Sequence, residues 1–370
     1  MDKQKHCLRE ILTAAVFIVI VGVLFVLNNA IPTPPVLVAE RRVPAKFPEF
    51  TMRAISSGTF MNKFDDYASD HFSFRDTFRG INAFITLDVY QMSDKSGLYR
   101  SKNVGVGEFK RTDATSFRQT AERVKSAAAT LEGKDMNIYY SIVPDKSTFA
   151  EKYMPGFDLG LAESILSDVL GGYKYISIDS ALGAGSFYKT DLHWNQAKIS
   201  DVAARLLSEM GTGAVPGENP VESAGEFRGV YAGQLALPVA ADTMSYVDVP
   251  GLEVSYLSEK TLQFESGPIY DTGRFNGVDP YDLFLRGPQP LIVIENKEAT
   301  VQRELYLFRD SFGSSLAPLL ASGYSKITLI DLRYINLALL PQFVDFVPGS
   351  DVLFIYGSQI FNNPSILQTR

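Results

Sequence analysis

The distribution of hydrophobic and polar residues along this chain first predicts a membrane anchor. Residues 11–27 form an apolar run without a charged side chain. A run of about 17 residues is just long enough for a helix to cross the hydrocarbon core of a bilayer. Three basic residues precede it: Lys3, Lys5 and Arg9. By the positive-inside rule, we expect a cytoplasmic tail over residues 1–10, a membrane-spanning helix over 11–31, and export of the residues that follow.

A cleaved secretory signal is the alternative interpretation of this segment. The apolar run is longer than the core of a usual signal, and no small-residue cleavage site follows it cleanly. Both interpretations place the rest of the chain outside the cytoplasm. Residues 32–50 contain five prolines and are predicted to form an extended stalk.

Beyond residue 50, helical and strand-like segments alternate, which is typical of an α/β domain. Predicted helices cover residues 60–79, 113–131, 161–170, 196–210 and 313–321. Predicted strands cover residues 137–143, 173–178, 291–294, 304–308, 326–330 and 352–356. The later strands are continuous apolar runs, as in parallel sheets. The alternating pattern of residues 243–273 predicts an antiparallel β insertion. We expect one exported domain over residues 51–360.

Composition supports a packed core and narrows the chemistry. The chain has 370 residues, of which 46% are hydrophobic, and a formal net charge of −7. This charge gives no electrostatic reason to expect a nucleic acid as partner. The only cysteine is Cys7, in the predicted cytoplasmic tail. The exported part therefore offers no thiol for a disulfide, a cysteine nucleophile or a sulfur-ligated metal.

Imidazole chemistry outside the cytoplasm must use His71 or His193, because the third histidine is His6. His193 lies in the sequence Asp-Leu-His-Trp-Asn over residues 191–195, directly before a predicted helix. A carboxylate two residues before a histidine can accept a hydrogen bond from one ring nitrogen, which fixes the tautomer and raises the basicity of the other nitrogen. The alternative is that Asp191 caps the helix and that His193 packs at its start.

The second candidate segment is a strand that runs directly into a serine. Apolar residues 305–308 are followed by Arg-Asp-Ser, with Ser311 at the start of a helix rich in small residues. A serine on a strand-to-helix turn lies at the carboxyl edge of the sheet, where nearby amides can stabilise an oxyanion. Its hydroxyl becomes a good nucleophile only with a base. Asp191, His193 and Ser311 supply an orienting carboxylate, a base and a nucleophile. An ordinary helix cap is the alternative role of Ser311.

Four segments resemble motifs of the bacterial DHHW proteins. They are residues 67–75, 190–195, 310–312 and 330–334, which read Tyr-Ala-Ser-Asp-His-Phe-Ser-Phe-Arg, Thr-Asp-Leu-His-Trp-Asn, Asp-Ser-Phe and Ile-Asp-Leu-Arg-Tyr. That family is similar to the periplasmic alginate O-acetyltransferases, whose fold looks like a rearranged SGNH hydrolase. The resemblance covers about residues 40–360. It implies an α/β fold of SGNH-hydrolase-like type, with a parallel sheet flanked by helices. It also implies that an Asp-x-His pair lies upstream of the nucleophilic serine.

The resemblance maps Asp191, His193 and Ser311 onto orienting carboxylate, base and nucleophile. We expect substrate contacts from Trp194, Asn195 and Asp310, and oxyanion donors from Ser311 and Gly287. Two positions depart from the family pattern. Leu192 stands where a second histidine is usual, which leaves the triad intact but weakens any metal site needing both. The turn at residues 285–288, which includes Gly287, matches poorly the Gly-Gly-Asn-like sequence expected there.

Two rival sites remain as alternatives. Asp70 and His71 could form one, although the family pattern makes the imidazole incidental, and we expect Asp70 and Arg75 to form a structural ion pair or a cap contact. Asp191, His193 and a distant carboxylate could form a metal site by ligand type. We expect neither a metal nor a cofactor.

The resemblance implies acyl transfer by a serine mechanism at the bacterial cell surface. The expected reaction is O-acetylation or deacetylation of a surface polysaccharide, with a membrane-bound acyl-transfer protein as a partner. Transferase and hydrolase are both compatible with these residues. A carbohydrate-binding protein or a cell-envelope assembly scaffold, neither of them catalytic, is the alternative from another class.

Overall fold

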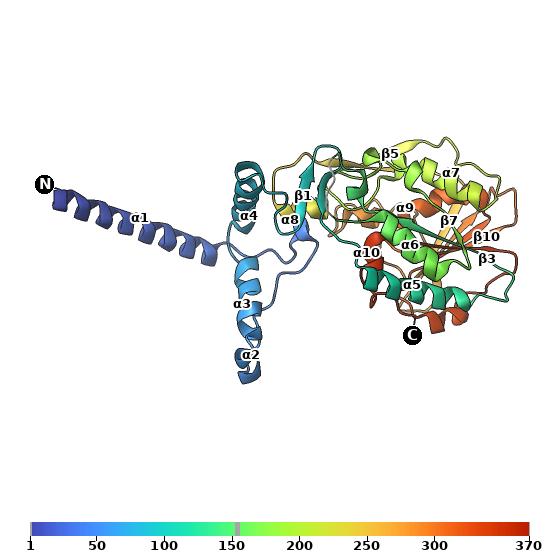
Figure 1. The fold of residues 1–370 in the computed structure, drawn as a ribbon, viewed down its shortest axis with the longest axis horizontal. Helices are drawn as coiled ribbons and strands as arrows, with labels where there is room; N and C mark the ends of the chain where they lie inside the picture. Colours follow the sequence, from blue (N-terminus) through green and yellow to red (C-terminus); the bar gives the residue numbers. More distant parts are fainter. Residues whose placement is uncertain (1, 152–155, 370) are drawn as a thin grey trace. The chain divides into compact units, whose positions relative to one another are not determined.

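The computed structural model describes residues 2–151 and 156–369, which form two compact units (Figure 1). One unit contains the residues up to Gln91 together with Gly233–Pro238, and the other contains Met92–Ala232 and the residues from Val239 onward. Residues 51–91, which the sequence pattern places in the α/β domain, lie in the first unit. The two units are described separately below as the anchor unit and the sheet unit.

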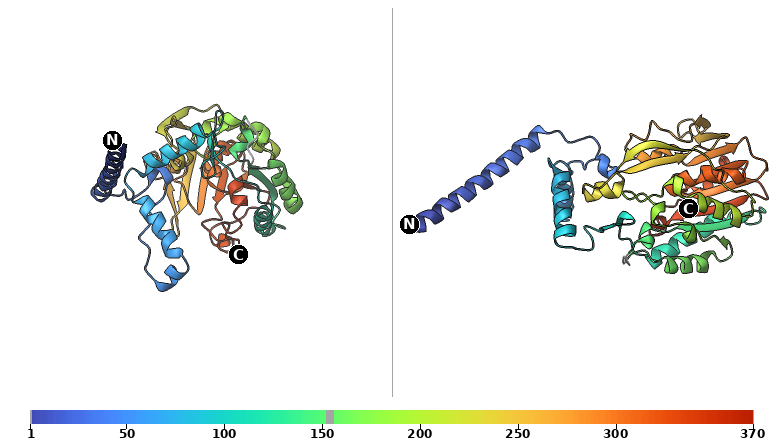
Figure 2. Two further views of the ribbon diagram at one scale, coloured as in Figure 1. Left: turned by 60° about the vertical axis from the view of Figure 1, so that its left-hand side comes forward. Right: turned by 90° about the horizontal axis from the view of Figure 1, so that it is seen from above.

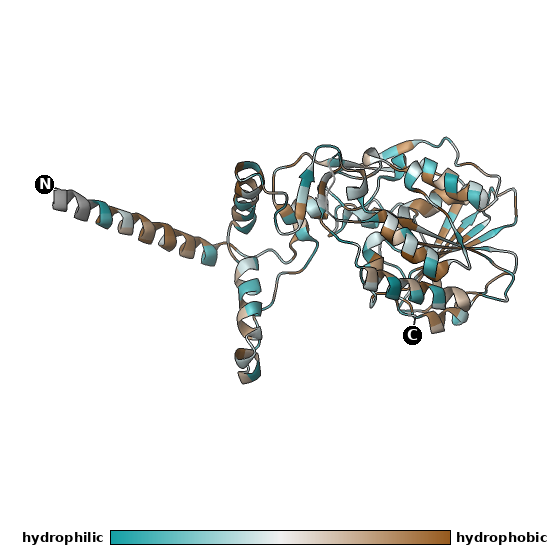
Figure 3. Ribbon diagram, viewed as in Figure 1, coloured by the Kyte–Doolittle hydropathy of each residue, from teal (hydrophilic) through white to brown (hydrophobic). Residues whose placement is uncertain are grey.

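The anchor unit is helical. Its elements are α1 (Asp2–Ala30), a 3₁₀ turn η1 (Val38–Glu40), α2 (Met52–Ser56), α3 (Thr59–Asp70), α4 (Arg75–Phe84) and a π-helical turn η2 (Ile85–Val89). The stretch Arg9–Ala30 of α1 has a mean hydropathy of 2.8 and is not buried, so by length and composition it can cross a membrane (Figure 3). The predicted apolar N-terminal helix is confirmed.

The helix expected over residues 60–79 is interrupted at a corner. Helix α3 ends at Asp70, and α4 begins only at Arg75. Between them, Phe74 has a φ of 62°, a left-handed conformation that no continuous right-handed helix allows. The pattern of apolar residues cannot reveal this break, because no Gly or Pro marks it.

The sheet unit is built around eight strands in the order β4-β3-β12-β10-β11-β9-β7-β8. In chain order they are β3 (Asn137–Val143), β4 (Lys174–Tyr175), β7 (Leu252–Leu257), β8 (Phe264–Gly267), β9 (Leu291–Asn296), β10 (Glu304–Arg309), β11 (Lys326–Ile330) and β12 (Asp351–Gly357). The run from β4 to β11 is parallel. The strand β10 therefore lies in the parallel region between β11 and β12, and its carboxyl end opens at an interior position of the sheet edge.

Helices cover both faces of the sheet (Figures 1 and 2). They are α5 (Ala114–Ala129), α6 (Leu159–Leu170), α7 (Ser200–Glu209) and α9 (Ser311–Leu320), with the short helix α10 (Ser358–Phe361). The short helix α8 (Val230–Leu235) is divided between the two units. Alternate residues of β10 enter different cores: Leu305 and Leu307 pack with α7 and α9, whereas Tyr306 and Phe308 pack with α5 and α6. This burial of both faces explains the continuous apolar runs in the sequence. The predicted α/β fold is confirmed.

The antiparallel part is larger than expected. Strands β7 and β8 form a hairpin that extends the main sheet, as predicted. Strand β6 (Asp242–Val247) instead pairs with β5 (Val221–Phe227) in a separate sheet, and a second small sheet joins β1 (Leu98–Ser101) to β2 (Gly105–Glu108). Strand β9 runs antiparallel to β11, whereas its apolar run suggested a parallel strand. Apolar runs report burial on both faces, and they do not report strand direction.

Candidate active site

The structure brings Asp191, His193 and Ser311 together at the carboxyl end of β10. The Nε2 of His193 lies 2.8 Å from the Oγ of Ser311, and its Nδ1 lies 2.7 Å from the Oδ1 of Asp191. Asp191 and His193 are buried, and Ser311 is partly exposed. A carboxylate, an imidazole and a hydroxyl in this line can pass a proton from the hydroxyl to the ring.

Ser311 is placed by the turn between β10 and α9. Asp310 caps the helix: its Oδ1 accepts from the amide of Phe312 at 3.0 Å, and its Oδ2 accepts from the amide of Gly357 at 2.7 Å. Gly357 ends the neighbouring strand β12, so the cap also joins two strand ends. Burial raises the pKa of the Asp310 carboxyl, against the opposing effect of Arg333 and of these two amides.

Two features of this turn suit Ser311 to nucleophilic attack. A side chain at Gly313 would place its Cβ 2.5 Å from the Cβ of Arg309, so the glycine lets α9 approach the end of β10. The amide of Ser311 is the first of α9 and has no partner within the helix. Free amides at a helix N-terminus stabilise negative charge. The geometry therefore supplies one oxyanion donor beside the hydroxyl.

Asp191 is held by the loop that carries it and by a neighbouring turn. Its Oδ1 accepts from the backbone amide as well as the Nδ1 of His193, and its Oδ2 accepts from the amide of Val230 at 3.1 Å. A Cβ at Gly229 would lie 2.4 Å from the Cβ of Asp191, so only glycine allows this approach. Thr190 is fixed by Asp242, whose Oδ2 accepts from the Thr190 amide at 2.7 Å.

Lys146 is a buried cation beneath the same loop. Its Nζ donates to the carbonyl oxygens of Tyr188 at 2.7 Å and Asp191 at 2.9 Å. Burial lowers the pKa of Lys146 to about 8, although nearby carboxylates oppose the shift. The ammonium thus ties both sides of the Asp191 loop together. Lys146 lies just after β3, which ends at Val143, and so at the same edge of the sheet as Ser311.

Tyr281 is a site residue that no motif in the sequence indicated. Its ring stacks on the imidazole of His193, with centroids 3.7 Å apart and planes 8° apart. Its hydroxyl lies 2.7 Å from the Oγ of Ser315, which also accepts from the Nε1 of Trp194 at 2.7 Å. Ser315 donates its own proton to the carbonyl of Phe312, so Tyr281 is the donor to Ser315.

The residues predicted to contact substrate have structural partners in this arrangement. Trp194 is fully buried and packs edge-on against Phe312 at 5.2 Å. Asn195 caps a 3₁₀ turn by accepting from the amide of Ala197, and Asp310 caps α9. These contacts account for the three side chains without a ligand, and their substrate contacts stay predictions.

Gly287 has a different geometry from the one expected of an oxyanion donor. Its φ is 74°, and its amide donates to the carbonyl of Phe284 at 3.1 Å. Leu285 and Arg286 before it also have positive φ, of 52° and 60°. Residues other than glycine rarely adopt a positive φ, so the turn carries backbone strain.

The segment 330–334 forms a buried ion cluster next to the Ser311 turn. Asp331 pairs with Arg333 at 2.7 Å and with Arg309 at 3.3 Å. Arg309 also donates to the carbonyl of Asp310 at 3.3 Å. Arg309 ends β10 and Asp331 directly follows the adjacent strand β11, so this cluster holds the carboxyl edge together.

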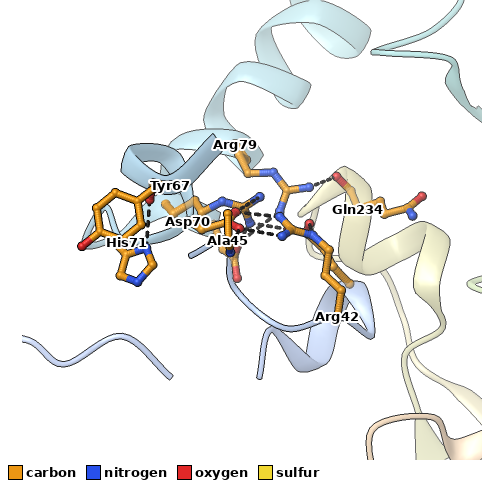
Figure 4. A network of polar contacts seen from close by, with 10 residues as sticks. Arg42, Ala45, Tyr67, Asp70, His71, Arg79 and Gln234 are labelled. Atoms are coloured by element: carbon orange, nitrogen blue, oxygen red, sulfur yellow. Dashed lines mark hydrogen bonds and ion pairs between the residues drawn. The ribbon is translucent and has the colours of Figure 1, made fainter. Parts of the chain in front are cut away.

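Asp70 and His71 belong to the anchor unit, where they have structural contacts (Figure 4). Arg42 donates to both Asp70 oxygens at 2.6 Å, and Arg75 lies 3.4 Å from one of them. The ring of His71 lies 4.0 Å from that of Tyr67, and its Nδ1 lies 2.9 Å from the Tyr67 carbonyl oxygen. Asp70 and Arg75 therefore form the expected ion pair. Within residues 2–151 and 156–369, no group of three or more His, Cys, Asp or Glu side chains could hold a metal ion.

Comparison with known proteins finds solved structures with a similar fold. No family model matches the chain, and no curated protein matches it. A DHHW family protein from Eubacterium siraeum superposes with a TM-score of 0.58 at 18% identity, over 75% of this chain and 98% of that one. PatB1 of Bacillus cereus with a sulfonyl adduct gives 0.57 at 15% identity, over 70% and 94%. The chain therefore has the fold of these two proteins, in agreement with the resemblance seen in its motifs.

Proposed function

We propose that this protein is an extracytoplasmic serine acyltransferase or esterase. Ser311 is the nucleophile, His193 the general base, and Asp191 the carboxylate that orients His193. The observation that carries the proposal is the 2.8 Å separation of the His193 Nε2 and the Ser311 Oγ, two atoms from residues 118 positions apart in sequence. The likeness of fold to the DHHW family protein and to PatB1 supports it.

The reaction follows from the positions of these atoms. The Nδ1–H of His193 donates to Asp191, which leaves Nε2 free to take the proton of the Ser311 hydroxyl. The Ser311 oxygen attacks the carbonyl carbon of an acyl ester or thioester, and the Ser311 amide stabilises the oxyanion. The leaving group departs with the proton from Nε2. A sugar hydroxyl or a water then attacks the acyl-enzyme, with His193 again as the base, which restores Ser311.

The substrate class comes from the resemblance. We propose acetyl groups as the acyl cargo, a cell-surface polysaccharide as acceptor or substrate, and a membrane-bound acyl-transfer protein as the source of acetyl groups. The helix α1 would keep the catalytic unit at the outer surface of the membrane. None of these steps requires a cofactor or a metal.

The nucleophile assignment is tested with a sulfonyl fluoride or fluorophosphonate probe. The sulfonyl adduct described for PatB1 makes this chemistry a suitable choice for a protein of the same fold. Wild type should be labelled at Ser311 and should release acetate or an alcohol from a generic acetyl ester. Ser311→Ala should abolish both.

Ser314→Ala is a matched control, because Ser314 is a buried hydroxyl on the same helix. It should keep the labelling. Labelling of Ser311→Ala at the wild-type level would defeat the assignment. Binding of a polysaccharide by wild type without turnover of any ester would favour the non-catalytic alternative.

A further inference from the structure

The helix α4 and its continuation η2 expose an apolar stripe. Its members are spaced three or four residues apart, so they lie on one side of the helix. They are Phe74, Phe78, Ile81, Ile85 and Val89, which are 39–57% exposed. A helix of a soluble domain normally turns such a stripe towards its core.

The opposite side of α4 carries small and charged residues and packs against the rest of the anchor unit. Ala83 is buried, and a Cβ at Gly80 would lie 2.5 Å from the carbonyl oxygen of Ala236. Arg79 lies on the same side, where it pairs with Glu40 and donates to the carbonyl of Gln234 (Figure 4). The helix is therefore oriented with its apolar side outward. This arrangement is stable where the outer medium is itself apolar.

The start of α4 is fixed to the end of the candidate membrane span. Ser73, in the corner before α4, donates its amide to the Oδ1 of Asn28 at 2.8 Å and its hydroxyl to the carbonyl of Leu27 at 3.3 Å. The candidate span Arg9–Ala30 covers 22 residues, a helix of about 33 Å, which matches a hydrocarbon core of about 30 Å. Leu27 and Asn28 lie in the last turn of this span, so the corner that they bind would lie near the membrane boundary.

Aromatic side chains surround this corner. Phe72 and Phe74 flank Ser73 and are both exposed. The rings of Phe72 and Phe78 are 5.7 Å apart. Phe is one of the residues that interfacial amphipathic helices carry on the apolar side that they bury in the bilayer.

We propose that α4 and η2 form a second membrane contact, with the stripe defined above immersed in the outer interface of the bilayer that α1 crosses. The occupant is lipid, because the hydrogen bonds of Ser73 place the start of the stripe at the end of the span. The inference rests on α1 being retained as an anchor and is independent of the proposed catalysis. The protein would then be held by one spanning helix and one interfacial helix.

Depth measurements on the full chain test this contact. Cys7→Ser removes the only cysteine, so that Ile81→Cys can be labelled with an environment-sensitive fluorophore. The labelled protein is reconstituted in vesicles of phosphatidylcholine and phosphatidylglycerol, with and without lipids that carry a quencher near the headgroup. Asp201→Cys, at an exposed position of α7, is the matched control. We expect a blue shift and loss of fluorescence with the quencher at position 81, and neither at position 201.

A variant with a charged stripe distinguishes immersion of α4 in the bilayer from attachment of the protein through α1. With the label at Val89→Cys, the double substitution Phe78→Asp and Ile81→Asp should abolish the quenching while α1 keeps the protein on the vesicle. Emission of Trp194 reports whether the sheet unit stays folded in each variant. Equal, water-like emission at positions 81 and 201 would overturn the proposal. A blue shift at position 81 without quenching by lipid, together with crosslinking to a second protein, would assign the stripe to a protein partner and overturn it as well.

Discussion

Each oxygen of the Asp191 carboxylate has its own task. Oδ1 accepts from the amide and the Nδ1 of His193, and Oδ2 accepts from the amide of Val230. A carboxylate can serve these donors together, because it offers acceptor sites on both oxygens. An asparagine side chain in its place has one oxygen and one NH₂ group. It can therefore accept a hydrogen bond either from the His193 ring or from the Val230 amide, but not from both.

Asp191→Asn should therefore lower turnover of a generic acetyl ester by about 10³–10⁴-fold, by letting His193 adopt the wrong tautomer or orientation. The sheet unit should remain folded. Steady-state kinetics measure the loss, and emission of Trp194 checks the fold. Asp201→Asn, on the exposed side of α7, should leave turnover unchanged. Turnover of Asp191→Asn within tenfold of wild type would contradict the role proposed for this carboxylate.

Tyr281 acts on His193 through its ring rather than its hydroxyl. The stack fixes the plane of the imidazole, and an aromatic pair of this kind is worth about 1 kcal/mol. Tyr281→Leu should lower turnover by about tenfold, with KM nearly unchanged. Tyr281→Phe keeps the ring and should recover most of the activity. An equal loss in the Phe and Leu variants would assign the effect to the hydroxyl bond with Ser315, because both variants lack the hydroxyl.

The chemistry of individual residues was readable from the sequence, but their surroundings were not. Asp-x-His before a helix and Asp-Ser after a strand each suggested a candidate site, and the structure places these groups within hydrogen-bond reach. Tyr281 gave no signal, because its position over His193 depends on a loop that enters from a distant part of the chain. Gly287 has its amide bonded elsewhere, and a glycine in a sequence does not reveal such a bond.

At the level of elements, the buried α/β core was predictable, because a strand that is buried on both faces has an unbroken run of apolar residues in the sequence. Strands β10, β11 and β12 lie at the expected positions. The predicted strand over residues 173–178 contains the short edge strand β4, whereas the exposed strand β5 was not predicted because it has few apolar residues. The break between α3 and α4 also left no sign, because Phe74 adopts its left-handed conformation only with the support of tertiary contacts.

The contact between Arg42, which follows η1, and Asp70 at the end of α3 makes the anchor unit sensitive to acid. Hydrogen bonds from Arg42 hold the pKa of Asp70 at about 2, below its ordinary value of 3.8. The unfolded chain takes up this proton at higher pH than the folded chain does. The resulting stabilisation, about 2 kcal/mol, is therefore complete above the ordinary pKa and is lost as the pH falls towards 2.

Asp70→Asn should thus destabilise the anchor unit by about 2 kcal/mol at neutral pH, and the difference from wild type should vanish between pH 4 and pH 2. Denaturation followed by circular dichroism measures this loss of helix. The only tryptophan, Trp194, lies in the sheet unit, so its emission should follow the same course in both proteins. Asp76→Asn is the matched control, since this exposed carboxylate should contribute less than about 1 kcal/mol. A pH-independent difference would point to lost packing instead of lost charge.

On the scale of the whole molecule, the sequence predicts a protein with one end in the cytoplasm and its catalytic groups outside. The basic residues before the apolar run set that orientation, and α1 has the length and composition to cross the membrane. The hydrogen bonds from Ser73 to Leu27 and Asn28 use groups that a cleaved signal would remove. These contacts favour retention of the helix.

A membrane-impermeant maleimide tests this topology on intact cells. Cys7 should react only after the membrane is opened. A chain carrying Cys7→Ser and Asp201→Cys should react without that treatment. The protein should stay in the membrane fraction after alkaline carbonate washing, and a chain that lacks residues 1–30 should not. Release of the wild-type protein with a shortened N-terminus would establish the cleaved signal.

The bond between the Gly357 amide and Asp310 has a consequence for biogenesis. The turn bearing the nucleophile is completed by β12, the most C-terminal strand of the sheet, which inserts between β3 and β10. A chain translocated in the order of its sequence, starting after the anchor, would expose Ser311 before this strand arrives. Under the proposed function, Ser311 would become reactive only after this closing strand has been delivered, which would limit premature hydrolysis of acyl groups during secretion.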